Sequence, residues 1–103
     1  MNQIERIERM EQYLDASAAA IRTLSEALDA YEQTEKGLQK LCDYYGSTRW
    51  MKDFEDDENG KLPKELKRGV LSEDAVYDLI TEHHELILRM TRIVTKAIEG
   101  KTL

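Results

Sequence analysis

The sequence predicts an all-α fold: a long antiparallel helical hairpin, with helices over about residues 4–45 and 73–99 and a short-helical, aromatic-rich connector between them. Two observations lead to this prediction. Apolar residues recur at helical spacing through both long segments, and the 103 residues include only one Pro and five Gly. At this length we expect a single helical domain over residues 1–103.

The first long segment follows a seven-residue apolar repeat of the kind found in coiled coils. Polar residues interrupt its two seam positions only at Ser17 and Glu35, and no Pro breaks it. A continuous helix here would be about 60 Å long. The pattern predicts a helix that packs along another helix. The seam positions are Ile7, Met10, Leu14, Ser17, Ile21, Leu24, Leu28, Tyr31, Glu35, Leu38, Cys42 and Tyr45.

The second long helix is expected to follow Ser72, because serine caps helix starts and two acidic residues come directly after it. A broad apolar face then continues to Ala97, and Gly100 is placed to end the helix. This face predicts packing against the first helix.

The connector carries several local structure signals. Ser47 is placed to cap a short helix, Asn59-Gly60 indicates a turn, and Pro63 can open a second helical turn over Lys64–Arg68. Four of the seven aromatic residues fall within eleven positions here and are expected to plug the hairpin end as a structural connector. These residues are Tyr44, Tyr45, Trp50 and Phe54. Tyr45 and Trp50 are predicted to be largely buried, with Leu62 and Leu66 beneath them.

The composition narrows the class of function. A formal net charge of −6 and an isoelectric point near 4.9 argue against nucleic-acid binding, which needs a surplus of Lys and Arg. Cys42 is the only cysteine, so an intramolecular disulfide is excluded and a small buried apolar residue is expected. The longest uncharged run, Ala16–Ile21, is too short to span a membrane. A charged N-terminus without a leader then predicts a cytoplasmic protein.

Two acidic pairs offer the main enzymatic alternative. Glu8 with Glu11, and Glu26 with Asp29, have the spacing with which all-α nucleoside-triphosphate pyrophosphohydrolases hold magnesium. Such a site needs its pairs on two facing helices. Here the pairs lie about 27 Å apart on one helix, unless the chain turns near Asp15–Ala20.

The acidic stretch Asp53–Glu58, followed by Asn59-Gly60, is similar to part of a calcium-binding loop. Leu66 stands where the loop requires a bidentate Glu, and Pro63 lies inside it. The favoured interpretation is a solvated acidic turn that faces a basic run. The basic residues are Lys61, Lys64, Lys67 and Arg68.

The two histidines do not form a metal motif. His83 and His84 are adjacent, so on a helix their side chains point about 100° apart. His83 lies within the apolar face and is expected to be a partly buried, hydrogen-bonded residue. We therefore assign no catalytic, cofactor-binding or metal-binding residue, and we expect no cofactor.

Three short motifs follow one another through the connector. They are Tyr44-Tyr45-x-Ser47-x-x-Trp50-x-x-Asp53-Phe54, Asp57-x-x-Gly60-x-Leu62-Pro63 and Arg68-Gly69-Val70-Leu71-Ser72-Glu73-Asp74. With these motifs the chain resembles a family of small bacterial proteins classed as a domain of unknown function. The resemblance implies a bacterial, cytoplasmic origin and no assigned activity, so no functional residue carries over from it.

We interpret the chain as a helical protein-interaction or regulatory protein that acts as a homodimer, with a possible further protein partner and no nucleic acid or membrane. The alternative is a metal-dependent nucleotide hydrolase-like enzyme assembled across a dimer, although the residues favour a protein that is not an enzyme. Acidic mimicry of nucleic acid is a third class, supported by net charge alone.

Helix lengths locate the expected interface. An antiparallel second helix of about 27 residues would cover the first only back to about Ser17. The part beyond it would carry a bare apolar strip, and exposed strips of this kind mark interfaces. A straight first helix and a dimer are favoured over a break near Asp15, which would give a monomeric three-helix bundle. The residues of this strip are Ile4, Ile7, Met10 and Leu14.

Overall fold

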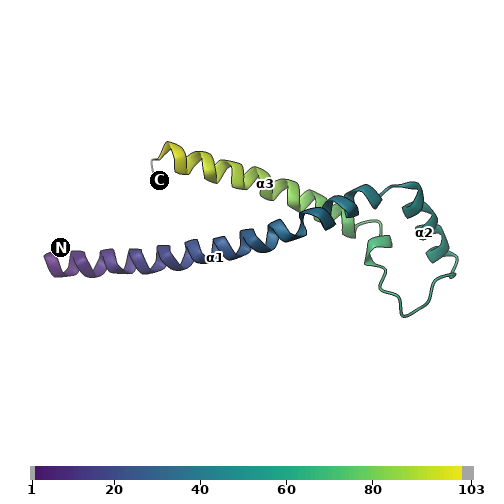
Figure 1. The fold of residues 1–103 in the computed structure, drawn as a ribbon, viewed down its shortest axis with the longest axis horizontal. Helices are drawn as coiled ribbons and strands as arrows, with labels where there is room; N and C mark the ends of the chain where they lie inside the picture. The colour runs from purple at the N-terminus through teal and green to yellow at the C-terminus, as the bar shows by residue number, and fades with distance from the viewer. Residues whose placement is uncertain (1, 101–103) are drawn as a thin grey trace. The chain divides into compact units, whose positions relative to one another are not determined.

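The computed structural model describes residues 2–100 and is helical throughout its regular structure (Figure 1). Its elements are α1 (Gln3–Tyr44), α2 (Thr48–Glu58), the 3-10 helix η1 (Gly69–Leu71) and α3 (Ala75–Glu99). No strand occurs among the described residues. The predicted all-α fold is confirmed: a long helix, a short-helical connector and a second long helix follow one another as in a helical hairpin, with bounds within two residues of those expected.

The chain divides into two compact units, Met1–Leu38 and Gln39–Leu103, and the boundary falls inside α1. The N-terminal unit is a single stretch of helix. Asn2 caps it, since its Oδ1 accepts the backbone N–H of Glu5 at 2.8 Å. The helix runs unbroken through Asp15–Ala20, where alanine favours helix and neither Gly nor Pro occurs. The straight helix is therefore confirmed, and the alternative break near Asp15 is wrong.

The C-terminal unit contains the connector, and its first half has the predicted caps and turns. Gly46, with φ +79°, follows the end of α1 in the left-handed region that glycine enters without strain. Ser47 caps α2, because its side chain accepts the N–H of Trp50 at 3.1 Å. The Asn59-Gly60 turn is present as well, with Gly60 at φ +70°. Each of these features depends on residues close in sequence.

The second half of the connector differs from the expectation. The predicted helical turn over Lys64–Arg68 is wrong. The backbone there makes only one hydrogen bond of a turn, from the N–H of Leu66 to the carbonyl of Pro63 at 3.2 Å. The short helix lies later, at η1. Ser72 links η1 to α3, since its hydroxyl donates to the carbonyl of Gly69 at 2.8 Å and accepts the N–H of Ala75 at 3.1 Å. Ser72 therefore makes a bond of the kind expected of a cap, but α3 begins at Ala75 and its N-cap residue is Asp74, whose side chain makes no cap bond.

The buried core lies where η1 meets the start of α3. Leu71 and Val76 keep 6% and 3% of their surface exposed, and they are the only buried residues among those described. Tyr45, Trp50 and Leu62 are half-buried rather than largely buried. Leu66 is 48% exposed, so its predicted place beneath the aromatic rings is wrong. Cys42 and His83, expected to be buried and partly buried, are both half-buried. Most of the apolar surface of the long helices lies outside this small core.

Candidate interaction surfaces

The most extensive apolar surface of the N-terminal unit is the seam of α1. The seam side chains are 40–68% exposed, and heptad spacing places them along one face of the helix. We define the α1 seam as Ile7, Met10, Leu14, Ile21, Leu24 and Leu28. Apolar faces of this kind are a common feature of helices that pack against another helix.

The predicted interface strip lies at the start of this seam. Ile4 is 68% exposed and Leu14 61%, while Ile7 and Met10 are each 53% exposed. All four lie on the same unbroken helix, three or four residues apart. Their exposure is as expected, and their role in an interface stays a prediction.

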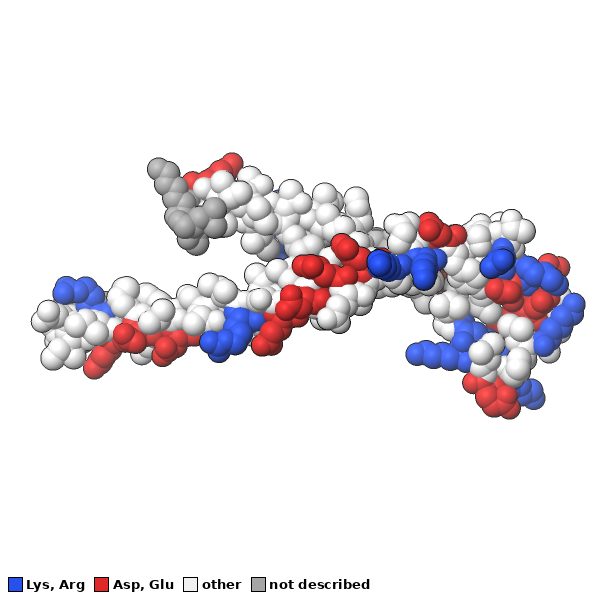
Figure 2. Space-filling view, in the orientation of Figure 1, with Lys and Arg blue, Asp and Glu red and all other residues white. Residues whose placement is uncertain are grey.

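The two acidic pairs lie on the same helix and do not converge. Glu8 and Glu11 are exposed, and so are Glu26 and Asp29 eighteen residues further along α1. Figure 2 shows acidic groups along one edge of α1, and intermixed acidic and basic groups around α2. Since the pairs are about 27 Å apart along one axis, a single chain does not bring them to one ion.

The connector aromatics form a compact cluster of Tyr45, Trp50 and Phe54. The Trp50 ring stacks on Phe54 at 5.2 Å and meets Tyr45 edge-on at 5.3 Å. The Nε1–H of Trp50 donates to the carbonyl of Val70 at 2.8 Å, and the Tyr45 hydroxyl donates to the carbonyl of Glu73 at 3.0 Å. These bonds join the end of α1 and the start of α2 to the segment that leads into α3. The aromatic cluster therefore joins these three segments of the C-terminal unit, and the predicted role of the aromatic residues in closing the hairpin end stays a prediction.

Tyr44 belongs to the same region but faces a carboxylate. Its hydroxyl donates to Oδ2 of Asp53 at 2.6 Å. Partial burial, together with the hydrogen bond and the charge of Asp53, raises the pKa of Tyr44 from 10.0 to about 12. The neutral phenol is the stable form at physiological pH, so this contact is a structural hydrogen bond rather than an activated base.

The acidic residues at the end of α2 are engaged by basic side chains. Nη1 of Arg68 lies 2.7 Å from Oδ1 of Asp57, and both groups are partly buried. Oδ1 of Asp56 lies 2.9 Å from Nζ of Lys52 and 3.9 Å from Nζ of Lys61. The hydrogen bond that Lys52 donates to Asp56 lowers the pKa of the Asp56 carboxyl and raises the pKa of Lys52. The predicted acidic turn facing basic residues is confirmed at Asp56 and Asp57.

This arrangement does not suit a calcium loop. Glu55 and Asp57 lie inside α2, where neighbouring carboxylates point in different directions instead of converging on an ion. Among the described residues, no group of three or more His, Cys, Asp or Glu side chains is placed to hold a metal ion.

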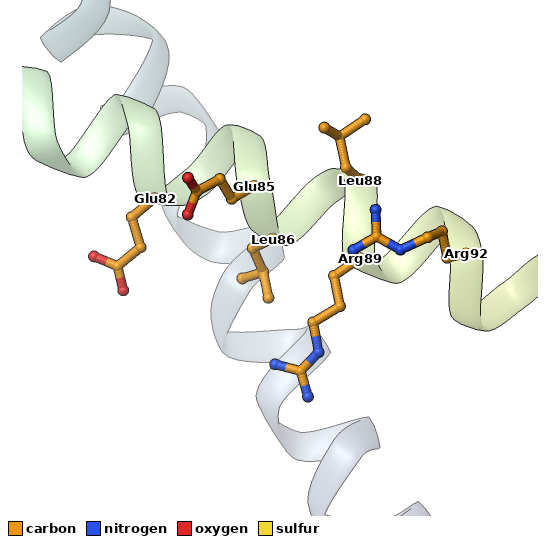
Figure 3. Close-up of a pocket in the computed structure, with 6 residues that line it drawn as sticks. All are labelled: Glu82, Glu85, Leu86, Leu88, Arg89 and Arg92. Carbon is orange, nitrogen blue, oxygen red and sulfur yellow. The ribbon is translucent and has the colours of Figure 1, made fainter.

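The middle of α3 borders a shallow hollow (Figure 3). Its lining contains two carboxylates and, one to two turns further along the helix, two guanidinium groups, with two leucines between them in sequence. All of these side chains fan out from one helix, so they suit solvation and ion pairing better than enclosure of a small molecule. The lining residues are Glu82, Glu85, Leu86, Leu88, Arg89 and Arg92.

The family described as a domain of unknown function, DUF4298, matches residues 7–93. The chain belongs to this family. No curated protein and no solved structure matches it. Within the part of the chain described, no helix offers an apolar stretch of the length that a membrane crossing needs.

The DUF4298 match extends from Ile7, the first residue of the α1 seam, to Ile93 in α3, so it contains the whole connector. Two features of this region were missed by the sequence analysis. The acceptor for Trp50 is the backbone carbonyl of Val70, which leaves no trace in residue type. The apolar face of α3 was assigned to packing, yet much of it is exposed. Its exposed members include Leu79, Leu86, Ile87, Ile93 and Val94.

Proposed function

We propose that this DUF4298 protein is a helical protein-interaction or regulatory protein of the bacterial cytoplasm that acts as a homodimer through α1. The observation that supports the proposal is the exposed α1 seam on a continuous helix. A soluble protein rarely leaves an apolar surface of this size in water unless a partner covers it. A regular heptad pattern selects another helix as that partner.

The enzymatic alternative has less support. A nucleotide hydrolase assembled across a dimer has only the spacing of the two acidic pairs in its favour. The hollow beside α3 combines charged and leucine side chains of one helix, and it brings no nucleophile together with a base. The interaction class therefore explains the α1 seam, while the enzyme class leaves it unexplained.

The experiment is light scattering on the full chain at micromolar concentration. We expect a particle of twice the 12.0 kDa chain mass. Ile7→Glu should reduce this to the monomer mass while circular dichroism retains most of the helical signal, because the substitution places a charge in the apolar seam. Gln12→Glu is the matched control, since it adds the same charge on the exposed side opposite the seam. A monomeric wild-type chain would contradict the proposal.

A further inference from the structure

We infer that two copies pair through residues 3–35 of α1 in an antiparallel register centred on Ala19. The strip Ile4, Ile7, Met10 and Leu14 of one copy then lies along the second half of the partner's seam. The inference rests on the proposed homodimer and identifies the surface that covers the strip.

In this register the apolar seam residues of one copy face apolar seam residues of the other. In an antiparallel helix pair, each first seam position of one helix faces a second seam position of the other. With the centre at Ala19, apolar residues face apolar residues along most of the seam, and the polar residues Gln3 and Glu35 meet at the ends. The facing residues are Ile7 with the partner's Tyr31, Met10 with the partner's Leu28, Leu14 with the partner's Leu24, and Ser17 with the partner's Ile21.

Other registers match less well. A shift of one heptad in one direction sets Met10 against the partner's Glu35, and a shift in the other sets Leu28 against the partner's Gln3. A parallel pair would place Glu35 against its own copy within the seam, where like charges repel. It would gain an exposed pair of Arg6 with the partner's Glu11, and pairs of that kind contribute little.

The size of the surface agrees with this pairing. Residues 3–35 form about 50 Å of helix, and a contact strip roughly 10 Å wide on each copy gives about 1,000 Å² of buried surface in total. That is the lower limit for a specific dimer. The five residues Ala16–Ala20 lie at the centre, where small side chains allow two helices to approach closely. The centre also divides the N-terminal unit, Met1–Leu38, into two nearly equal halves.

The register also fixes the charges beside the seam. In the antiparallel pair, Asp15 meets the partner's Arg22 midway along one edge, and on either side of that attractive pair Glu8 and Glu11 run beside the partner's Asp29 and Glu32. These exposed carboxylates repel each other, and salt screens the repulsion. The antiparallel dimer should therefore become tighter as ionic strength rises, because salt weakens this repulsion.

Disulfide trapping tests the register. Leu14→Cys and Leu24→Cys are made separately in a Cys42→Ser background, and the proteins are unfolded, mixed, refolded and oxidised. We expect a covalent dimer from the mixture and none from either protein alone, because residue 14 lies about 15 Å along the axis from its own copy. The matched control is a mixture of Gln12→Cys and Glu26→Cys, which have the same axial relation on the outward side and should not be trapped.

The outcomes separate the register from the dimer. Covalent dimers of Leu14→Cys alone would overturn the antiparallel register in favour of a parallel one. A particle of dimer mass with no trapping in any mixture would overturn this register. The proposed dimer through α1 would still stand if Ile7→Glu reduced that particle to the monomer mass, and it would fall with the register if Ile7→Glu left the mass unchanged. A monomeric wild-type chain would overturn both.

A second measurement avoids substitutions in the seam. Spin labels at the exposed Gln12 should lie about 21 Å apart along the axis in the centred antiparallel dimer, and labels at the exposed Gln33 about 42 Å. A parallel dimer has no axial offset at either position, so the two labelled proteins would give the same distance. The dimer dissociation constant of the unmodified chain should also fall as salt rises, and a dissociation constant that rises with salt would contradict the register.

Discussion

The α1 seam and the connector use apolar side chains in opposite ways. Along the seam, large apolar residues are exposed, and the side-chain hydrogen bonds of Asn2 and Thr34 nearby reach only three residues along the helix. In the connector, Trp50 reaches Val70 and Tyr45 reaches Glu73, twenty and twenty-eight residues away. The aromatic side chains of the connector therefore make their contacts within the chain, whereas the apolar side chains of the seam remain exposed and available to another helix.

This difference predicts two kinds of response to substitution. A change in the connector should lower the free energy of unfolding, because it removes a contact inside the chain. A polar change in the seam, such as Ile7→Glu, should change the mass of the particle. Because a dimer makes stability depend on concentration, connector variants need to be compared at one fixed protein concentration.

Trp50→Ala should give the largest loss of stability, about 3 kcal/mol. It removes the stacking on Phe54 and the edge contact with Tyr45, and it leaves the Val70 carbonyl without this donor. Urea unfolding followed by circular dichroism measures the loss. The exposed neighbour Arg49→Ala is the control and should change stability by less than about 0.5 kcal/mol.

The fluorescence of the wild-type chain gives an independent check of the aromatic cluster. Trp50 is the only tryptophan and is half-buried, so its emission maximum should lie to the blue of that of a tryptophan in water. A maximum typical of full exposure would contradict the packing of the connector.

The next largest effect is expected from alkaline pH, which should weaken the hydrogen bond between Tyr44 and Asp53. The folded-state pKa of Tyr44, about 12, is above the ordinary value of 10.0, so folding favours the protonated phenol. The stabilisation is complete below pH 10 and is lost as pH rises from about 10 to 12. Tyr44→Phe should lack this part of the pH dependence, while Tyr77→Phe, at an exposed position, should keep it. Identical pH profiles for wild type and Tyr44→Phe would contradict the assignment.

The ion pair of Asp57 with Arg68 should contribute a smaller amount. Their side chains are 25% and 32% exposed, so solvent screens the pair, and we expect a coupling of about 0.5–1 kcal/mol. A double-mutant cycle with Asp57→Asn and Arg68→Met measures this value. The same cycle on Lys52 and Asp56, where the lysine is 64% exposed, should give a weaker coupling. A stronger coupling of Lys52 with Asp56 than of Asp57 with Arg68 would show that the turn does not depend on Arg68.

These contacts show which parts of the structure the sequence could predict. The cap at Ser47 and the turn at Asn59-Gly60 depend on a few neighbouring residues, so residue type was sufficient. The turn over Lys64–Arg68 was predicted wrongly. The Arg68 side chain bonds both the carbonyl of Lys64 and the carboxylate of Asp57, eleven residues away, and such a distant contact cannot be recognised from neighbouring residue types. Periodicity likewise identified the α1 seam and the strip within it. Periodicity does not identify the helix that covers this surface, because many different helices can pack against one apolar face.

The smallest expected effect is that of calcium, which should not change the melting temperature of the chain. Asp56 and Asp57 already face Lys52, Lys61 and Arg68, and a cation would have to displace these basic groups. The last ligand position of the loop holds Leu66, whose side chain offers no oxygen. Thermal unfolding with millimolar calcium and with a chelator should therefore coincide, and calorimetry should detect no micromolar site. Micromolar binding that disappears in Asp57→Ala would contradict this prediction. It would show that the acidic turn can exchange its ion pairs for a metal.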